Sequence, residues 1–331
     1  MENHPHTENG GQDFVRFEKA WLPHWQMHDV WRFQGILRDI ACPDRHYAWR
    51  CSLNKFPAGW YSLFMAMHDI GANTASSQRT VFHTGLLPIK KPLLSIDEES
   101  IFAGEQLQLL DSPQAMALVM QNGEMHATFC LVKPQSQKTY GQDRQIWRRE
   151  EGADKPYLTS LAFPQTATSC RLQAADRQLK LVGRSVVDRA FGPYDYRKTA
   201  NQYERFYFFF NNGAEAALWH FPREGRCQGV YFPLSREQQR IDGVKIEIAD
   251  SRVWNNWKFS DQWNVTMPQV LQEDFCLKPM GEPSFSAPCA WQVNGIYDQD
   301  GEKLGYCLAE SWIGAQSEKN RIPRSLLKYS H

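Results

Sequence analysis

The chain of 331 residues is long enough for two domains of ordinary size or for one large β-rich body, and either could bury a sizeable core. Its 37 basic residues balance 37 acidic ones, so the net charge gives no argument for nucleic acid, an anionic membrane surface or a polyacidic substrate. We therefore expect a neutral or apolar small molecule as the partner.

The eight cysteines are scattered, with no CxxC pair and no histidine at the spacing of a metal site. The first residues, MENHPHTENGGQDF, are polar and lack the apolar core of a signal peptide. No later segment approaches the roughly 18 apolar residues of a membrane span. Neither a dinucleotide fingerprint nor a phosphate-binding loop is present. These observations predict a cytoplasmic protein with reduced thiols, no metal and no organic cofactor.

Short aromatic and β-branched segments with alternating polarity follow one another along most of the chain, which predicts β-strands. In chain order these segments are HDVWRFQGILRD, HYAWRCSLNKF, GWYSLFMAMHD, MHATFCLVK, RQLKLVGRSVVD, RFYFFFNNGAEAALWHF, QGVYFPL and VKIEIAD. Turn residues in NNGAE and DQDGEK predict two hairpins. One short helix is predicted near 97–110, where acidic residues come early and apolar spacing follows.

Many antiparallel strands must avoid exposed edges, and closure into a barrel or a double sheet is the usual solution. The polar stretch at 133–156 carries charges and turn formers without a hydrophobic period, as connections between domains do. We therefore predict an all-β fold of two antiparallel barrel or sandwich domains that pack together. The predicted domains are 15–145 and 156–331.

Four parts of the sequence resemble the signatures of one family, in the order in which that family has them. HDVWRFQGILRD is similar to its E-W-W-Y-x-x-G-x-L strand, and LFMAMHDIGANTASSQRTVFHTG to its H-F-x-L-x-D hairpin. VGRSVVDRAFG resembles its G-x-x-W-x-D-H/R-x-W/F-G signature. DQWNVTMP and CAWQVNGIYDQDGEKLGYCLAESW resemble its closing elements. The family is the lipocalin-like one of bacterial carotenoid 1,2-hydratase (hydroxyneurosporene synthase) and the predicted secreted hydrolases, with kievitone hydratase and fungal decalin-forming Diels–Alderases as distant relatives.

Three positions depart from these signatures. Val186 stands where the family has tryptophan, Gln292 replaces the acid of a W-E-G element, and the segment YCLAESW shifts or loses the closing glutamate. The resemblance implies two lipocalin-like domains packed together, with an apolar cavity and no organic cofactor. The 12 Trp, 12 Tyr and 19 Phe residues agree with such a cavity, although a single aromatic side chain more often fills a core.

Asp188 lies in the stretch GRSVVDRAFG, where strand alternation places it on one face with Val182 and Val186. A carboxyl group in such surroundings either pairs with a cation or keeps its proton, and the protonated state is a competent general acid. The structural alternative is that Asp188 accepts backbone N–H groups in a following turn or pairs with Arg184 or Arg197. The resemblance implies an acid at this position, so Asp188 is the first candidate catalytic residue.

Further candidates come from the strands near the carboxyl end. Glu310 is the nearest match to the closing glutamate of the family, and Glu204 enters the strand that carries Tyr207. We predict both glutamates as catalytic residues. Tyr207 and Trp219 are predicted to share one face of a strand pair, with His220 pointing the other way. The predicted substrate-binding residues are Trp31, His68, Tyr207, Trp219 and Trp291.

No Ser-His-Asp order and no nucleophile elbow supports hydrolysis. In a cyclase, the cavity would fold a polyene or enone into a reactive conformation while an acid or hydroxyl polarises a carbonyl. In a hydratase, a protonated Asp188 would deliver its proton to an alkene, and water would capture the cation. The altered closing elements favour the cyclase, with a ligand of polyketide or terpenoid type. A protein that binds a lipophilic ligand without catalysis is the third alternative.

Overall fold

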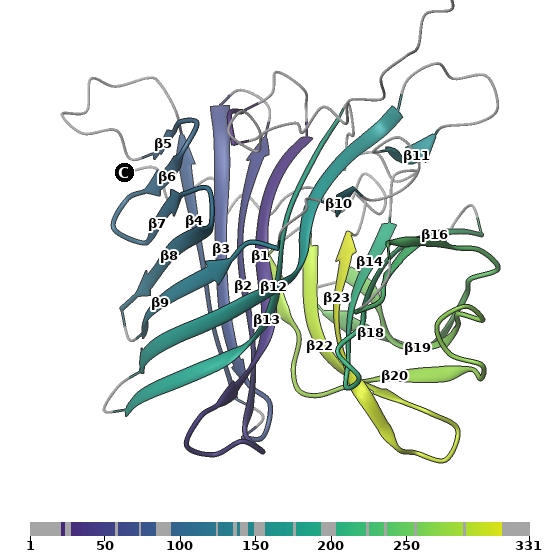
Figure 1. The fold of residues 1–331 in the computed structure, drawn as a ribbon. Helices are drawn as coiled ribbons and strands as arrows, with labels where there is room; N and C mark the ends of the chain where they lie inside the picture. The colour runs from purple at the N-terminus through teal and green to yellow at the C-terminus, as the bar shows by residue number, and fades with distance from the viewer. Residues whose placement is uncertain are drawn as a thin grey trace, which may run out of the picture.

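The computed structural model describes residues 21–23, 28–56, 59–72, 74–83, 94–123, 125–134, 138–139, 145–148, 156–174, 177–192, 203–222, 225–234, 237–254, 257–286 and 289–312. Every regular element in these ranges is a β-strand, and the strands form one sheet of 13 and another of 10 (Figure 1). All the strand pairs are antiparallel, which confirms the predicted all-β fold. No helix that could cross a membrane occurs in these ranges.

The first sheet has the spatial order β4-β3-β2-β1-β13-β12-β9-β8-β7-β6-β5, and β10 and β11 pair with β12. Its strands are β1 (His28–Asp39), β2 (His46–Phe56), β3 (Trp60–Asp69), β4 (Thr74–His83), β5 (Leu94–Ile96), β6 (Ser100–Ala103), β7 (Leu107–Asp111), β8 (Ala115–Asn122), β9 (Met125–Val132), β10 (Lys138–Thr139), β11 (Gln145–Arg148), β12 (Pro156–Ala174) and β13 (Arg177–Gly192).

The second sheet has the order β17-β16-β15-β14-β23-β22-β20-β19-β18, and β21 pairs with β22. Its strands are β14 (Tyr203–Phe210), β15 (Glu215–Phe221), β16 (Arg226–Phe232), β17 (Gln239–Ile241), β18 (Lys245–Trp254), β19 (Trp257–Thr266), β20 (Phe275–Pro279), β21 (Ser284–Ser286), β22 (Cys289–Tyr297) and β23 (Lys303–Trp312). Both predicted hairpins are present, between β14 and β15 and between β22 and β23.

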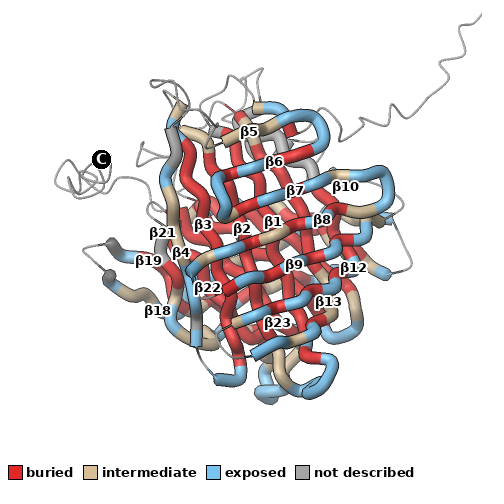
Figure 2. The backbone as a smooth tube through the Cα atoms, turned by 90° about the vertical axis from the view of Figure 1, so that its left-hand side faces the viewer, coloured by how far each residue is buried: buried red, intermediate tan, exposed pale blue. Residues whose placement is uncertain are grey.

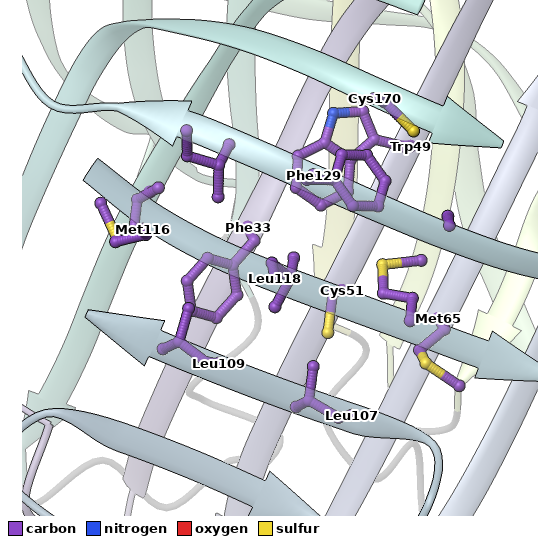
Figure 3. Packing of buried hydrophobic residues seen from close by; sticks show 14 of the residues in the cluster. Phe33, Trp49, Cys51, Met65, Leu107, Leu109, Met116, Leu118, Phe129 and Cys170 are labelled. Atoms are coloured by element: carbon purple, nitrogen blue, oxygen red, sulfur yellow. The ribbon is translucent and has the colours of Figure 1, made fainter. Parts of the chain in front are cut away.

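The first sheet curls over itself, so that β5–β9 cross in front of β1–β3 (Figure 2). Phe33, Trp49 and Met65 on β1–β3 pack there against Leu118 and Phe129 on β8 and β9 (Figure 3). Burial in β9 alternates residue by residue, because its outer face meets solvent. In β3 every residue after the first is buried, which requires cover on both faces of the strand.

The second face of β1–β3 is covered by the other sheet. Phe64 and Val186 of the first sheet share one apolar cluster with Tyr207, Trp219 and Trp291 of the second. The second sheet has a separate core on its opposite side, built from side chains such as Phe206 and Leu277. We call the contact between the two sheets the inter-sheet face. It lies between β1, β2, β3 and β13 on one side and β14, β15, β22 and β23 on the other (Figure 1).

The glycine that opens GRSVVDRAFG is required by the close approach of β13 to β1. A Cβ atom at Gly183 would lie 2.2 Å from the carbonyl oxygen of Ile36, and one at Gly35 would lie 2.4 Å from that of Arg184. Glycine therefore allows the two strands to pair without interruption. The resulting register sets Asp188 directly opposite Arg32.

Two predictions of the organisation need correction. The helix expected near 97–110 is wrong, because β6 and β7 occupy this segment and bury alternate residues such as Leu107 and Leu109. The domain boundary predicted between 145 and 156 falls inside the first sheet. The long strands β12 and β13 follow that polar stretch, but they pair back with β9 and β1. The change from one sheet to the other comes between Gly192 and Tyr203.

Candidate functional site

The inter-sheet face carries charged side chains within an otherwise apolar and aromatic contact. Arg32 on β1 is opposite Asp188 on β13, and Arg205 on β14 is opposite Glu310 on β23. Arg50 on β2 lies on the same face of the first sheet as Arg32. Each of these five residues is at most 2% exposed. We call them the arginine cluster.

Both carboxyl groups of the arginine cluster link the two sheets: Asp188 of the first sheet contacts an arginine of the second, and Glu310 of the second sheet contacts two arginines of the first. Asp188 Oδ1 accepts a hydrogen bond of 2.9 Å from Arg32 Nη1 in its own sheet, and Oδ2 accepts one of 2.7 Å from Arg205 Nη2 in the second sheet. Glu310 Oε2 lies 3.1 Å from Arg32 Nε and 2.8 Å from Arg50 Nη1, both in the first sheet. Three guanidinium groups therefore meet two carboxylates across the contact.

The charges of the cluster keep Glu310 ionised. Burial would raise the pKa of Glu310, but the charges of Arg32, Arg50 and Arg205 hold that pKa well below its usual range. The Nε1–H group of Trp312 adds a hydrogen bond to Glu310 Oε1. The five side chains thus comprise three guanidinium groups and only two carboxyl groups. A buried site of this kind favours an oxygen atom that is anionic or becomes so during a reaction.

Some polar atoms of the inter-sheet face have no hydrogen-bond partner among the described residues. Arg32 Nη2 and Trp291 Nε1 are buried donors of this kind, and Gln34 Oε1 is a buried acceptor. Gln34 follows Arg32 on the same face of β1, and Trp291 pairs with Glu310 in the register. Buried polar groups normally find partners, so the hydrogen-bonding capacity of these atoms is unused among the described residues.

A second buried carboxyl group lies on the inter-sheet face at the start of β15. The hydroxyl of Tyr207 donates a hydrogen bond to Glu215 Oε2, and the backbone N–H of Gln165 donates another of 2.8 Å to the same oxygen. Glu215 Oε1 has no hydrogen-bond partner among the described residues, although Arg184 Nη1 lies 3.4 Å away. We call Glu215, Tyr207, Gln165 and Arg184 the Glu215 cluster.

Glu215 is poised near neutrality. Burial raises its pKa to about 7, against the opposing effects of Arg184, the Tyr207 hydroxyl and the Gln165 N–H group. Arg184 compensates only in part, because its side chain is 30% exposed and also donates to the backbone carbonyls of Phe210 and Gly213. Both protonation states of Glu215 are therefore populated near neutral pH, as an acid–base group requires.

Glu215 is not among the residues that the sequence predicts for the site, because the stretch NNGAE predicts only a turn. One signal could have found it. In the strand EAALWHF, alternation puts Glu215 on the same face as Ala217 and Trp219, and Trp219 was already a candidate for binding. An acidic residue at the start of that apolar face is the feature to look for.

The structure brings several predicted site residues to the inter-sheet face. Asp188 and Glu310 meet there through Arg32, while Tyr207, Trp219 and Trp291 supply aromatic surface. The Arg205 guanidinium lies over the Trp219 ring, 5.4 Å from its centroid. Of the two states that the sequence leaves open for Asp188, the structure shows the ion-paired one. Its partners are Arg32 and Arg205 rather than Arg184, and Arg197 lies outside the described residues.

His68 lies on the same face of β3 as Phe64. Burial lowers the pKa of its imidazole, although Asp69 and a bond to the backbone of Met280 act in the opposite direction. Met280 directly follows β20 of the second sheet and packs against the inter-sheet face, so this bond links β3 to the end of a strand of the other sheet. His68 is therefore neutral near pH 7 and contributes to the packing of the inter-sheet face.

Glu204 and Trp31 lie elsewhere. Glu204 is on the opposite face of β14, where Oε2 is 2.8 Å from His220 Nδ1 and accepts a 3.2 Å hydrogen bond from Trp263 Nε1. The prediction that His220 points away from Tyr207 and Trp219 is thus confirmed, and Glu204 points away with it. Trp31 faces the interior of the first sheet, and its Nε1 donates a 3.0 Å hydrogen bond to the carbonyl of Trp21.

The described residues contain no group of three or more His, Cys, Asp or Glu side chains that could hold a metal ion. What they do contain is two curled antiparallel sheets, each around its own apolar core, with a polar site buried between them. This architecture is a lipocalin-like fold.

Several solved structures share this fold. The chain is similar to an AttH-type protein from Nitrosomonas europaea, with a TM-score of 0.74 and 10% identity over 89% of this chain and 95% of that one. It is similar to kievitone hydratase from Nectria haematococca, with a TM-score of 0.62 and 10% identity over 87% of this chain and 90% of that one. It is also similar to CghA with Sch210972, with a TM-score of 0.51 and 10% identity over 87% of this chain and 89% of that one.

No protein-family model matches the sequence, and no curated protein matches it. The structural likeness agrees with the lipocalin-like fold that the resemblance of the motifs implies. At 10% identity this likeness establishes the fold alone, because one fold carries many functions. Function therefore has to be argued from the residues of the inter-sheet face.

Proposed function

We propose that this protein is a cofactor-independent enzyme that binds an apolar polyene with a conjugated carbonyl group between its two sheets and cyclises it. The observation that carries the proposal is the arginine cluster: three buried guanidinium groups on an aromatic face, with a donor, Arg32 Nη2, that has no acceptor among the described residues. Preorganised donors in a water-excluded site stabilise the negative charge that develops on a carbonyl oxygen.

In this proposal the cluster residues have separate roles. Arg32 and Arg50 donate to the carbonyl oxygen of the ligand and draw electron density from its conjugated double bond, which favours attack by the diene. Asp188 and Glu310 are positioning residues that fix the guanidinium groups. Asp188 is not the acid, because both of its oxygens already accept hydrogen bonds from arginine.

The aromatic side chains would hold the ligand in a reactive conformation. Tyr207, Trp219 and Trp291 are buried on the same face as the arginine cluster. Orientation of the reacting groups alone contributes on the order of 7–11 kcal/mol to lowering a barrier. The similar structures of kievitone hydratase and of CghA with Sch210972 support an enzyme acting on a small organic molecule.

A hydratase is the second candidate, and Glu215 is the observation that favours it. A carboxyl group that holds its proton near pH 7 on an aromatic face could protonate an alkene, after which water would capture the cation. Incorporation of ¹⁸O from labelled water distinguishes the two reactions, because a cyclase transfers no oxygen to its product.

The test uses purified protein and linear polyenones that carry a diene, with chiral chromatography of the products. We expect one stereoisomer in excess over the uncatalysed reaction. Arg32→Lys keeps the charge but removes the forked donor, so turnover should fall by about 10²- to 10³-fold. Arg240→Lys is the matched control, because Arg240 is 66% exposed, and its turnover should equal that of the wild type.

Two outcomes would contradict this proposal. Binding of every polyenone without any product would leave a carrier of lipophilic ligands. Full turnover by a folded Arg32→Lys variant would remove the arginine cluster from the mechanism.

A further inference from the structure

We propose that Glu215, held in place by Tyr207 and Gln165, is the proton donor of this site and donates to the carbonyl oxygen of the ligand. The inference rests on the proposed function and names its acid, a residue on which the sequence motifs gave no information. Its basis is the geometry of the Glu215 cluster and the position of that cluster beside the arginine cluster.

The two carboxyl oxygens of Glu215 have different surroundings. Oε2 is occupied by two donors, the Tyr207 hydroxyl and the Gln165 N–H group. Oε1 is buried and has no hydrogen-bond partner among the described residues. With Oε2 saturated as an acceptor, the proton of the neutral acid resides on Oε1. Glu215 can therefore donate from Oε1 to a molecule in the inter-sheet face.

The backbone of Gln165 supports this arrangement at a cost in strain. Gln165 has a φ of 53°, in the left-handed region that residues other than glycine rarely adopt, and it lies where the register of β12 shifts between Phe163 and Thr166. This conformation aims its backbone N–H group at Glu215. The side-chain Nε2 of Gln165 donates a hydrogen bond of 2.9 Å to the carbonyl oxygen of Phe232. A strained residue whose N–H group positions an acid is typical of a functional site.

The charges around Glu215 suit an acid that gives up a proton and takes it back. Among the described residues the groups that act on it are Gln165 from β12, Arg184 from β13 and Tyr207 from β14. Arg184 is the only charged one, at 3.4 Å from Oε1. It is near enough to stabilise the carboxylate for a short time, and burial favours return of the proton.

The Glu215 cluster and the arginine cluster adjoin each other. Tyr207 comes two residues after Arg205 on the same face of β14, a spacing of roughly 7 Å along a strand. Glu215 itself pairs with Phe209, four residues after Arg205, and Arg184 is four residues before Asp188 on β13, so the acid lies roughly 13 Å along the strands from the arginine cluster. A carbonyl oxygen that lies on the aromatic surface between the clusters would therefore accept hydrogen bonds from Arg32 and Arg50 on one side and from Glu215 on the other.

The proton transfer is reversible and balanced. The proton moves from Glu215 Oε1 to the carbonyl oxygen, and the electron pair of the broken O–H bond remains on the carboxylate. The conjugated double bond becomes more electrophilic, the new C–C bonds form, and the resulting oxygen-bound proton returns to Glu215 as the ketone is restored. No oxidant, reductant or further reactant is needed.

The test measures binding of β-ionone, an apolar conjugated enone, by quenching of tryptophan fluorescence between about pH 6 and about pH 8.5. Only the protonated acid donates, so the wild-type Kd should rise about 30-fold over this range. Glu215→Gln retains an N–H donor, and its Kd should not depend on pH. In Tyr207→Phe the midpoint should move to higher pH, because a hydrogen bond that stabilises the carboxylate is lost. Glu302→Gln, at an exposed position, should match the wild type.

A wild-type Kd that is constant with pH, or the same pH dependence in Glu215→Gln, overturns the inference and leaves the proposed function intact. If no variant binds β-ionone, the ligand class of the proposed function fails. Infrared spectroscopy of the ligand-free protein then decides on Glu215. The proposal that Glu215 is the proton donor is supported if a protonated-carboxyl band fades as the pH rises through about 7 and is missing from Glu215→Gln. The lack of such a band in the wild type overturns the proposal.

Discussion

Glu310 and Glu215 are both buried on the inter-sheet face, yet the protein lowers the pKa of Glu310 and raises that of Glu215 to about 7. Burial acts on both in the same direction, by raising the pKa. Glu310 is ionised because Arg32 and Arg50 contact it directly. Glu215 has only Arg184, which is more distant and is shared with backbone carbonyls. The number of guanidinium groups within reach thus decides the protonation state.

The two glutamates should make stability depend on pH in opposite ways. The folded-state pKa of Glu310 lies below its unfolded value, so its contribution is present above that value and is lost as the pH falls through the folded pKa. The folded-state pKa of Glu215 lies above its unfolded value of about 4.5. Its contribution is therefore present at low pH and is lost as the pH rises through about 7.

The largest effect is expected from breaking the arginine cluster. Glu310→Gln or Asp188→Asn leaves guanidinium groups buried without their counter-charge, so the free energy of unfolding should fall by about 3–5 kcal/mol. Urea denaturation at neutral pH measures this fall in the free energy of unfolding. A fall below about 0.5 kcal/mol in both variants would mean that water reaches the arginine cluster, and Glu310 would then not differ from Glu215 in its electrostatic surroundings.

A smaller effect, of opposite pH dependence, is expected at Glu215. Glu215→Gln cannot ionise, so the stability of the wild type relative to this variant should fall by roughly 3 kcal/mol between about pH 4.5 and about pH 8. Denaturation curves across this range measure the difference between the two proteins. A difference that rises with pH would show that Glu215 is ionised in the folded state, as Glu310 is.

The smallest effect is expected at Glu204, which lies on the other face of β14. Glu204→Gln weakens the contacts with His220 and Trp263, so we expect the free energy of unfolding to fall by about 1–3 kcal/mol. Binding of β-ionone should be unchanged, because the second core is separate from the inter-sheet face. Weaker binding by at least about fivefold, in a folded variant, would bring Glu204 back into the site.

Strand alternation predicted much of what positions the site. It predicted the strands β1, β2, β3, β9, β13, β14, β15, β16 and β18, the face that Asp188 shares with Val186, and the opposite directions of Trp219 and His220. The turn residues predicted both hairpins, and the strands β8, β12 and β19 were not predicted. The same rule explains the error at 97–110, where the short strands β6 and β7 have too few residues to distinguish a period of two from a helical period.

The partners of Asp188 could not be predicted in the same way. Arg32 lies 156 positions away in the sequence, and Arg205 belongs to the other sheet. Their contact depends on the register of β1 with β13 and on the packing of two sheets, neither of which one strand encodes. Local pattern therefore located a buried acid, while long-range packing decided that it is ion-paired.

On the inter-sheet face, Glu215 should exchange its proton near pH 7, while Glu310 should stay ionised. The most direct measurement is an NMR titration of protein labelled with ¹³C at the glutamate carboxyl carbon, with Glu215→Gln and Glu310→Gln to assign the two signals. We expect the Glu215 signal to titrate at about pH 7 and the Glu310 signal to show the ionised form throughout. Two signals that both show the carboxylate from about pH 5.5 upward would contradict this expectation.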